Sequence, residues 1–264
     1  MAAIRIIKMI HKEQKKDSIG ISPRAIISKS AKIGKNCSVG DFSAIGDNCE
    51  IGDNTIIYDR VSILDNSNIG RNCIIQPGVV IGADGFAYER LHETLELERF
   101  PHIGGVKIGN NVEICSNCSI ARGSLSDTIV GNGTKLDALV HVAHNVQIGK
   151  NCALTAGVII GGSTIIGDTC WFGLNSTLKH KIKIGYKVIV GSGASVIDDI
   201  QDEDIVAGVP AKSIKHKVKS NQLFLMGGQS KHEKHKNITI LKEQFKMDCL
   251  LIGSAVLMVP LLCS

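Results

Sequence analysis

Aliphatic residues recur at every sixth position over most of this chain. The first run is unbroken from Ile33 to Ile81, and a second run keeps the same interval from Val130 to Val196, with Phe172 as its only aromatic member. A period of six fits neither the 3.6-residue repeat of an amphipathic helix nor the simple alternation of a half-buried strand. A short repeat of fixed length instead predicts a solenoid, in which successive units stack and bury one continuous core.

The other positions of the six-residue unit make this prediction more specific. Glycine commonly follows the aliphatic residue, and the fifth position of each unit is small or β-branched, as at Cys37, Thr55, Val140 and Ser176. Such units are typical of short strands that alternate with sharp turns. We therefore predict an all-β fold, a parallel β-helix over residues 21–212.

One long interruption breaks the repeat at about 83–107. The segment is rich in charged residues and contains Phe86, Tyr88 and Phe100. An insertion in a solenoid must protrude from the coil, and functional residues concentrate in such loops. We expect a protruding loop here and look for binding residues on it.

The two ends of the chain depart from the repeat. Residues 1–20 contain isoleucines broken by Arg5 and Lys8, without the apolar stretch of a secretory signal, and are expected to cap the first coil. At the other end Val209-Pro210 should terminate the strands, because proline lacks a backbone donor. We expect 213–264 to form a basic extension with a short helical tail and an apolar end.

The extension leaves several interpretations open. Its lysines suit an acidic partner such as a phosphorylated cofactor, an acidic carrier protein or a membrane surface, and they equally suit a solvated face. The apolar stretch at the end is shorter than the roughly 20 residues of a membrane-spanning helix. It can pack on the solenoid, make peripheral contact with a membrane, or have no role.

Composition agrees with an aliphatic core, since aromatic residues make up only 4% of the chain. The chain has nine cysteines, and Cys115 and Cys118 form a CxxC pair. Six of them occupy the fifth position of the repeat, where a small apolar side chain packs inside the coil: Cys37, Cys49, Cys73, Cys118, Cys152 and Cys170. Because no second CxxC completes a zinc site, we interpret them as structural thiols and expect no metal. Reduced thiols favour the cytoplasm.

The residues that suggest chemistry lie in the stretch HVAHNV, 141–146. Val142 and Val146 keep the inward register, so His141 and His144 should point away from the core. Acyl transfer to an amine or hydroxyl needs a base that removes a proton, and histidine titrates near neutral pH. The alternative is an ordinary surface histidine.

Four motifs extend beyond the repeat: IGADGF at 81–86, ARGSLSDTIVGNG at 121–133, VAHNVQIGKN at 142–151 and GVIIGGSTIIG at 157–167. In order and spacing they resemble the UDP-3-O-acylglucosamine N-acyltransferases of lipid A synthesis, within the hexapeptide-repeat acyltransferase superfamily. The resemblance implies a left-handed, three-sided coil of eighteen residues per turn. It also implies a homotrimer whose active sites lie between neighbouring subunits.

The resemblance also assigns roles to residues. It implies that His144 is the catalytic base and that the backbone N–H of Gly162 stabilises the oxyanion. Asp84, Gly85 and Phe86, in the loop after IGADGF, would help to form the acceptor site, although Gly85 equally fits a tight turn leaving the coil. Further substrate-binding candidates are His141, Asn145 and His180.

The sequence departs from the family in three places. The family carries an N-terminal uridine-binding domain that has no counterpart before these repeats. Ala121 replaces an acidic residue, and Lys181 stands where the family has a second histidine, one position from His180. In addition, AGVPAK at 207–212 is more typical of amino-sugar acetyltransferases that use acetyl-CoA.

We therefore expect an N-acyltransferase that moves an acyl group from an acyl carrier protein or CoA thioester to the amino group of a nucleotide-linked amino sugar. It should bind no cofactor tightly and no nucleic acid, and it should be cytoplasmic, with membrane association as a further option. Alternatives are an acetyl-CoA-dependent amino-sugar N-acetyltransferase of surface-glycan synthesis and a catalytically inactive hexapeptide scaffold. A zinc carbonic anhydrase of the same fold is disfavoured, because the spacing of HVAH differs from the histidine pair that such enzymes need.

Overall fold

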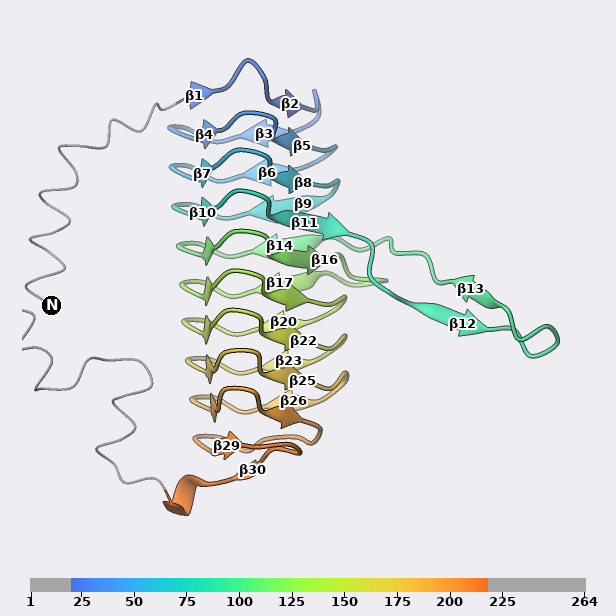
Figure 1. Cartoon of the computed structure of the whole chain (residues 1–264). Helices are drawn as coiled ribbons and strands as arrows, with labels where there is room; N and C mark the ends of the chain where they lie inside the picture. The colour runs from blue at the N-terminus through green and yellow to red at the C-terminus, as the bar shows by residue number, and fades with distance from the viewer. Residues whose placement is uncertain (1–19, 218–264) are drawn as a thin grey trace, which may run out of the picture. The chain divides into compact units, whose positions relative to one another are not determined.

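The computed structural model describes residues 20–217 as a parallel β-solenoid from which one hairpin projects (Figure 1). Short strands alternate with tight turns and form three long sheets along the solenoid. In a regular coil each strand pairs with the strand one turn later, as Ser38 pairs with Ile56 and Val39 with Ile57. Three strands therefore complete one turn. The all-β parallel solenoid predicted from the six-residue repeat is confirmed.

The strand bounds follow the repeat closely. The 11-stranded sheet contains β1 Gly20–Ile21, β4 Ser38–Val39, β7 Ile56–Ile57, β10 Ile74–Ile75, β15 Glu113–Ile114, β18 Lys135–Leu136, β21 Ala153–Leu154, β24 Trp171–Phe172, β27 Ile189–Val190, β29 Ile205–Ala207 and β30 Lys212–Ser213. The 9-stranded sheet contains β2 Ile26–Ile27, β5 Ala44–Ile45, β8 Ser62–Ile63, β11 Val80–Ala83, β16 Ser119–Ala121, β19 His141–Val142, β22 Ile159–Ile160, β25 Thr177–Leu178 and β28 Ser195–Val196. The 8-stranded sheet contains β3 Lys32–Ile33, β6 Glu50–Ile51, β9 Ser67–Ile69, β14 Val106–Ile108, β17 Thr128–Val130, β20 Gln147–Ile148, β23 Ile165–Ile166 and β26 Lys183–Ile184.

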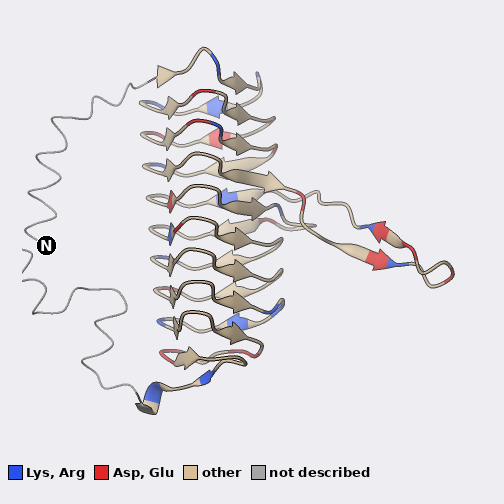
Figure 2. Ribbon diagram, in the orientation of Figure 1, with Lys and Arg blue, Asp and Glu red and all other residues tan. Residues whose placement is uncertain are grey.

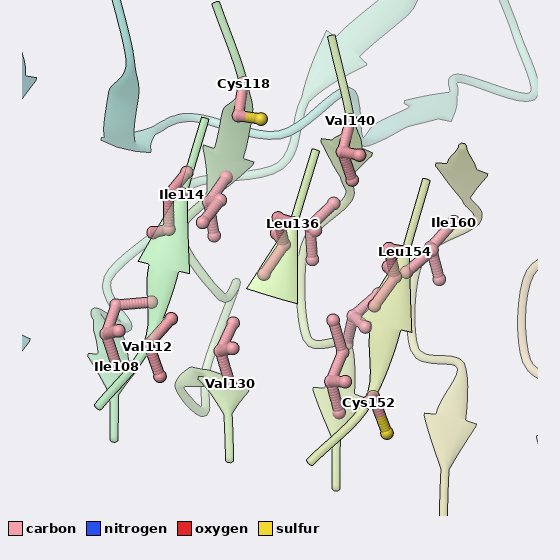
Figure 3. Close-up of a cluster of buried hydrophobic side chains, with 14 of the residues drawn as sticks. Ile108, Val112, Ile114, Cys118, Val130, Leu136, Val140, Cys152, Leu154 and Ile160 are labelled. Carbon is pink, nitrogen blue, oxygen red and sulfur yellow. The ribbon is translucent and has the colours of Figure 1, made fainter. Parts of the chain in front are cut away.

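The interior is a stack of aliphatic side chains, of which Figure 3 shows the middle coils. Strand residues such as Ile114, Leu136 and Leu154 are fully buried, and Cys118 and Cys152 pack beside them at the fifth position of the repeat. The cysteines within 20–217 are free thiols. Burial raises the pKa of the Cys118 thiol to about 11, so the thiol is uncharged at neutral pH and packs as a small apolar group.

The hairpin arises where β11 leaves the coil. Its strands, β12 Tyr88–Arg90 and β13 Leu97–Arg99, pair antiparallel and project from the solenoid, carrying acidic residues well away from the coil (Figure 2). The chain then resumes the solenoid without loss of register, because β14 pairs directly with β9 and Ile108 aligns with Ile69. A shorter loop between β16 and β17 behaves likewise, since Ile108 aligns in turn with Val130. Both insertions are therefore accommodated at corners of the coil.

At its C-terminal end the described solenoid changes its pairing. β29 and β30 pair antiparallel, on either side of Val209-Pro210, and a short 3-10 helix follows at Lys215–Lys217. The expected N-terminal cap at 1–19 and the extension beyond 217, with its helical tail and apolar end, lie outside the described residues. Among residues 20–217 no helix is long and apolar enough to cross a membrane.

Candidate active site

A pocket of about 480 Å³ lies at the base of the hairpin, beside the corner that follows β19. Its walls come from the first residues of the hairpin and from the corners of the next two coils. Of the eight candidate residues, seven line this pocket: Asp84, Gly85, Phe86, His141, His144, Gly162 and His180. The eighth, Asn145, lies directly beside it through a bond to His144. The structure thus brings together residues that are up to about a hundred positions apart.

The hydrogen bonds of Asn145 determine which nitrogen of His144 carries the proton. The amide nitrogen of Asn145 donates to the carbonyl oxygen of Ser126 at 3.0 Å, and its amide oxygen accepts from the backbone N–H of Ser124 at 3.1 Å. These contacts fix the orientation of the amide. The same oxygen lies 2.9 Å from Nδ1 of His144, so Nδ1 must be the protonated donor. Nε2 of the neutral ring is then free to accept a proton.

The loop between β16 and β17 supplies the groups that hold Asn145. In addition to the two backbone contacts, the hydroxyl of Ser124 donates to the amide oxygen at 2.7 Å. The backbone N–H of Asn145 itself donates to the hydroxyl of Thr128 at 2.9 Å. Asn145 has a φ of 60°, a left-handed conformation that asparagine tolerates better than most residues. The residue is therefore fixed by both its side chain and its backbone.

Gly162 lies in the equivalent corner one coil later, against the free nitrogen of His144. A Cβ placed on Gly162 would come within 2.8 Å of Nε2 and 2.9 Å of Cε1 of His144. Any side chain at this position would obstruct the nitrogen that accepts the proton. The absence of a side chain at 162 keeps Nε2 open to the pocket.

The backbone N–H of Gly162 is also uncapped. In several other corners the corresponding N–H donates to an aspartate side chain one coil later, as Asp47 does to Asp65 and Lys150 does to Asp168, both at 2.7 Å. The residue one coil after Gly162 is His180, and within residues 20–217 no acceptor pairs with the N–H of Gly162. A free backbone donor thus lies beside Nε2 of His144.

Asp84 lines the pocket and is also paired with arginines. Its carboxylate accepts a hydrogen bond from Arg99 of β13 at 2.8 Å and lies 3.8 Å from Nε of Arg122. Arg122 in turn donates to the carbonyl oxygens of Gly82 at 2.8 Å and Asp65 at 2.7 Å. This network ties the hairpin to the coil and gives Asp84 a structural part in the wall.

The remaining candidates surround the mouth of the pocket. Phe86 is 84% exposed and packs on Tyr88, with ring centroids 4.9 Å apart. Partial desolvation lowers the pKa of His141, so this ring is neutral at physiological pH. His180 and the neighbouring Lys181 are exposed and add basic groups to the rim. This rim offers an aromatic face, imidazole rings and the ammonium group of Lys181 to a ligand.

Several residues at the site were not found from the sequence. Ser124, Arg99 and Arg122 lie in or beside the inserted loops, where no repeat gives their register. His102, at the root of the hairpin, packs against His144 with ring centroids 5.6 Å apart. Within residues 20–217, no group of three His, Cys, Asp or Glu side chains converges to hold a metal.

Comparisons with known proteins agree with this architecture. Models of hexapeptide repeats match residues 127–162, described as bacterial transferase hexapeptide, and 163–197, described as hexapeptide repeat of succinyl-transferase. The C-terminal domain of GMPPB matches 21–86. Among solved structures, the UDP-N-acetylglucosamine acyltransferase of Bacteroides fragilis is 31% identical, with a TM-score of 0.67 over 78% of this chain and 81% of that one. The chain belongs to the hexapeptide-repeat acyltransferase superfamily.

Two further members place this hexapeptide-repeat chain more closely. The UDP-N-acetylglucosamine O-acyltransferase of Moraxella catarrhalis is 26% identical, with a TM-score of 0.66 over 89% of this chain and 95% of that structure. The fold is the left-handed parallel β-helix of these neighbours. The UDP-3-O-acylglucosamine N-acyltransferase of Bordetella pertussis is 42% identical over 145 residues, or 54% of this chain and 40% of that protein. The match thus covers less than half the length of the Bordetella pertussis protein.

Proposed function

We propose that the protein is an N-acyltransferase of the lipid A type, which moves an acyl group from a carrier thioester to the amino group of a nucleotide-linked amino sugar. The observation that carries this proposal is the pairing of an unprotonated Nε2 on His144 with the uncapped N–H of Gly162. A base beside a fixed oxyanion donor is the arrangement that acyl transfer requires. The 42% identity to an enzyme named for this reaction supports the choice of substrate class.

The chemistry follows from these two groups. The amino nitrogen of the acceptor attacks the thioester carbonyl carbon while Nε2 of His144 removes the proton that the nitrogen loses. Negative charge then develops on the carbonyl oxygen, where the N–H of Gly162 can stabilise it without reorganisation. When the carbon–sulfur bond breaks, the imidazolium returns the proton to the leaving thiolate. Asn145 keeps Nδ1 protonated throughout and so fixes the tautomer.

The acyl donor and the assembly belong to the same proposal. The donor is an acyl carrier protein or CoA thioester, and the basic groups of His180 and Lys181 at the rim suit its phosphate. A single solenoid leaves the pocket open on one side, so we place the complete site between neighbouring copies in a homotrimer. Light scattering coupled to size-exclusion chromatography tests this part, and a monomer under assay conditions would contradict it.

Product analysis tests the reaction itself. The protein is offered acetyl-CoA, 3-hydroxyacyl carrier protein and a panel of amino-sugar nucleotides, and products are identified by mass spectrometry. We expect an amide product with the 3-hydroxyacyl carrier substrate. A product with acetyl-CoA alone would instead indicate an amino-sugar N-acetyltransferase. No product with any pair would favour a scaffold protein.

A further inference from the structure

His102 is a buried histidine that the reaction proposed above does not use. Its side chain is only 7% exposed, and within residues 20–217 neither ring nitrogen has a hydrogen-bond partner. Burying an imidazole without partners destabilises the fold, and an apolar side chain of similar shape would avoid this cost. A residue that opposes stability at the edge of an active site is a candidate for a functional role.

The neighbours of His102 indicate what this role is. Its ring lies edge-to-face on the ring of His144, with centroids 5.6 Å apart and planes at 78°. Gly85 lies beside both histidine rings. A Cβ on Gly85 would lie 2.9 Å from Cδ2 of His144 and 3.0 Å from Nε2 of His102. The glycine leaves space for the two rings to approach each other, which a larger residue would prevent.

His144 needs such a contact, because its own anchoring is limited. The bond from Nδ1 to Asn145 sets the tautomer but allows the plane of the ring to tilt about that bond. Gly162, on the side of Nε2, has no side chain that could stop the tilt. The edge-to-face contact with His102 opposes it, since aromatic pairs prefer this geometry.

The surroundings of His102 keep its ring uncharged at neutral pH. Asp84, Arg99 and His144 are the titratable or charged groups that face it. Burial is the main cause that lowers the pKa of His102, and the proximity of His144 lowers it further while Asp84 opposes the shift. At neutral pH His102 therefore adds no charge beside the base, and a second cation would be unfavourable once His144 has taken its proton.

We propose that His102 is a positioning residue for His144: its buried ring holds the imidazole of His144 so that Nε2 stays directed at the pocket beside Gly162. The proposal rests on the proposed function, since it assigns His144 the part of the base. His102 itself touches neither substrate nor reacting atoms.

Two matched substitutions test the proposal. His102→Phe keeps an aromatic ring and removes both nitrogens, whereas His102→Ala removes the ring. We expect His102→Ala to lower kcat by about 10- to 100-fold with little change in either KM, because a misplaced base slows the chemical step. His102→Phe should stay within about threefold of the parent and be at least as stable in thermal unfolding. Equal losses in the two variants, or full activity in His102→Ala, would overturn the proposal.

The pH profile separates positioning from proton transfer. Because His102 is neutral in this role, His102→Phe should leave the pH dependence of kcat/KM unchanged. Loss of one limb of the profile in His102→Phe would show that His102 exchanges protons in the reaction, and the proposal would be wrong. If His102→Ala fails to fold, His102→Gln, which is polar but has no ring, takes its place.

A readout without turnover distinguishes this proposal from the proposed function. In protein labelled at histidine with nitrogen-15, the His144 signals are identified by their loss in His144→Ala. The parent and His102→Phe should show one ordered ring protonated at Nδ1, and His102→Ala should keep this tautomer but show exchange broadening of the His144 signals as the ring tilts. If this pattern holds in a protein that transfers no acyl group, the proposed function fails and the positioning stands. If the His144 signals of His102→Ala are as sharp as those of the parent, the positioning fails.

Discussion

The side chain of Asn145 determines which ring nitrogen of His144 carries the proton. Its amide oxygen receives hydrogen bonds from Ser124 and from Nδ1 of His144, while its nitrogen is committed to Ser126. A histidine held in this tautomer presents a lone pair at Nε2 at any pH where the ring is neutral. This hydrogen bond thus leaves the lone pair on the ring nitrogen that the proposed base would use.

The first prediction concerns the base itself. His144→Ala should lower turnover by at least about 100-fold, within the range that general bases contribute. The melting temperature should stay close to that of the parent, because His144 is a corner residue outside the buried core. Turnover measured with the best donor and acceptor, alongside circular dichroism, checks both parts. Near-normal turnover in a folded variant would refute the assignment.

The second prediction concerns the tautomer. Asn145→Gly removes the amide while allowing the left-handed φ of 60°, so it separates the hydrogen bond from backbone strain. We expect kcat to fall by about 10- to 100-fold as the ring loses its fixed tautomer. The amide nitrogen of Asn145 also donates to the hydroxyl of Ser126 at 3.0 Å. Ser126→Ala, which removes this hydroxyl but keeps the backbone carbonyl that holds the amide, serves as the control and should retain most activity. A variant Asn145→Gly with full kcat would contradict the role given to this bond.

In the corner at Gly162, one backbone N–H can either be capped, which stabilises the fold, or stay open for the proposed function. In several other corners an aspartate one coil later caps the corresponding N–H, as Asp65 and Asp168 do. At Gly162 the capping position holds His180, and among the residues that the structure describes this donor has no acceptor. The corner therefore gives up a hydrogen bond that the fold supplies in other coils.

The third prediction restores the missing cap on the N–H of Gly162. His180→Asp should let the carboxylate cap the N–H of Gly162, which raises the melting temperature and lowers kcat by roughly 100-fold, as for loss of one oxyanion donor. His180→Ala, which cannot cap, should be much closer to the parent in kcat. Thermal unfolding and steady-state kinetics on the same preparations test both effects. An active His180→Asp variant with an unchanged melting temperature would show that the cap does not form.

The six-residue repeat made the coil predictable, and with it the three site residues that lie in successive corners. His144, Gly162 and His180 are separated by whole coils, so the six-residue register places them in successive corners, and the motifs of the family identified His144 and Gly162. Asp84, also singled out, lines the same pocket, and its carboxylate contacts Arg99 and Arg122. Those arginines, Ser124 and His102 were not predictable, because an inserted loop has no period and its contacts are decided in three dimensions.

At the scale of the whole solenoid, one continuous core contains thiols that must stay protonated. Burial raises the pKa of Cys118 to about 11 and also raises that of Cys49 and of Cys73. An unfolded cysteine ionises near pH 8.5. The stabilising contribution of such a group is complete below that pH, and it is lost as the pH rises toward the folded value.

The fourth prediction follows from this sign. The free energy of unfolding should fall between about pH 8.5 and 11, by roughly 1 kcal/mol per pH unit for a thiol such as Cys118. Urea unfolding across this range measures the slope. Cys118→Val, which fills the same space without an ionisable group, should flatten it. A slope that is identical in parent and variant would show that Cys118 does not contribute.

Each strand pairs in register with the strand one coil later, so a whole coil can be removed from the solenoid without changing the register of the rest. Residues 44–61 form one complete coil, and without them β2 would meet β8 with Ile27 facing Ile63, as it now faces Ile45. Deleting this coil should leave the pocket unchanged and shorten the solenoid by one strand spacing, about 4.8 Å. A six-residue deletion would instead move each later strand onto the wrong sheet. The solenoid can therefore gain or lose whole coils ahead of the candidate active site without altering that site.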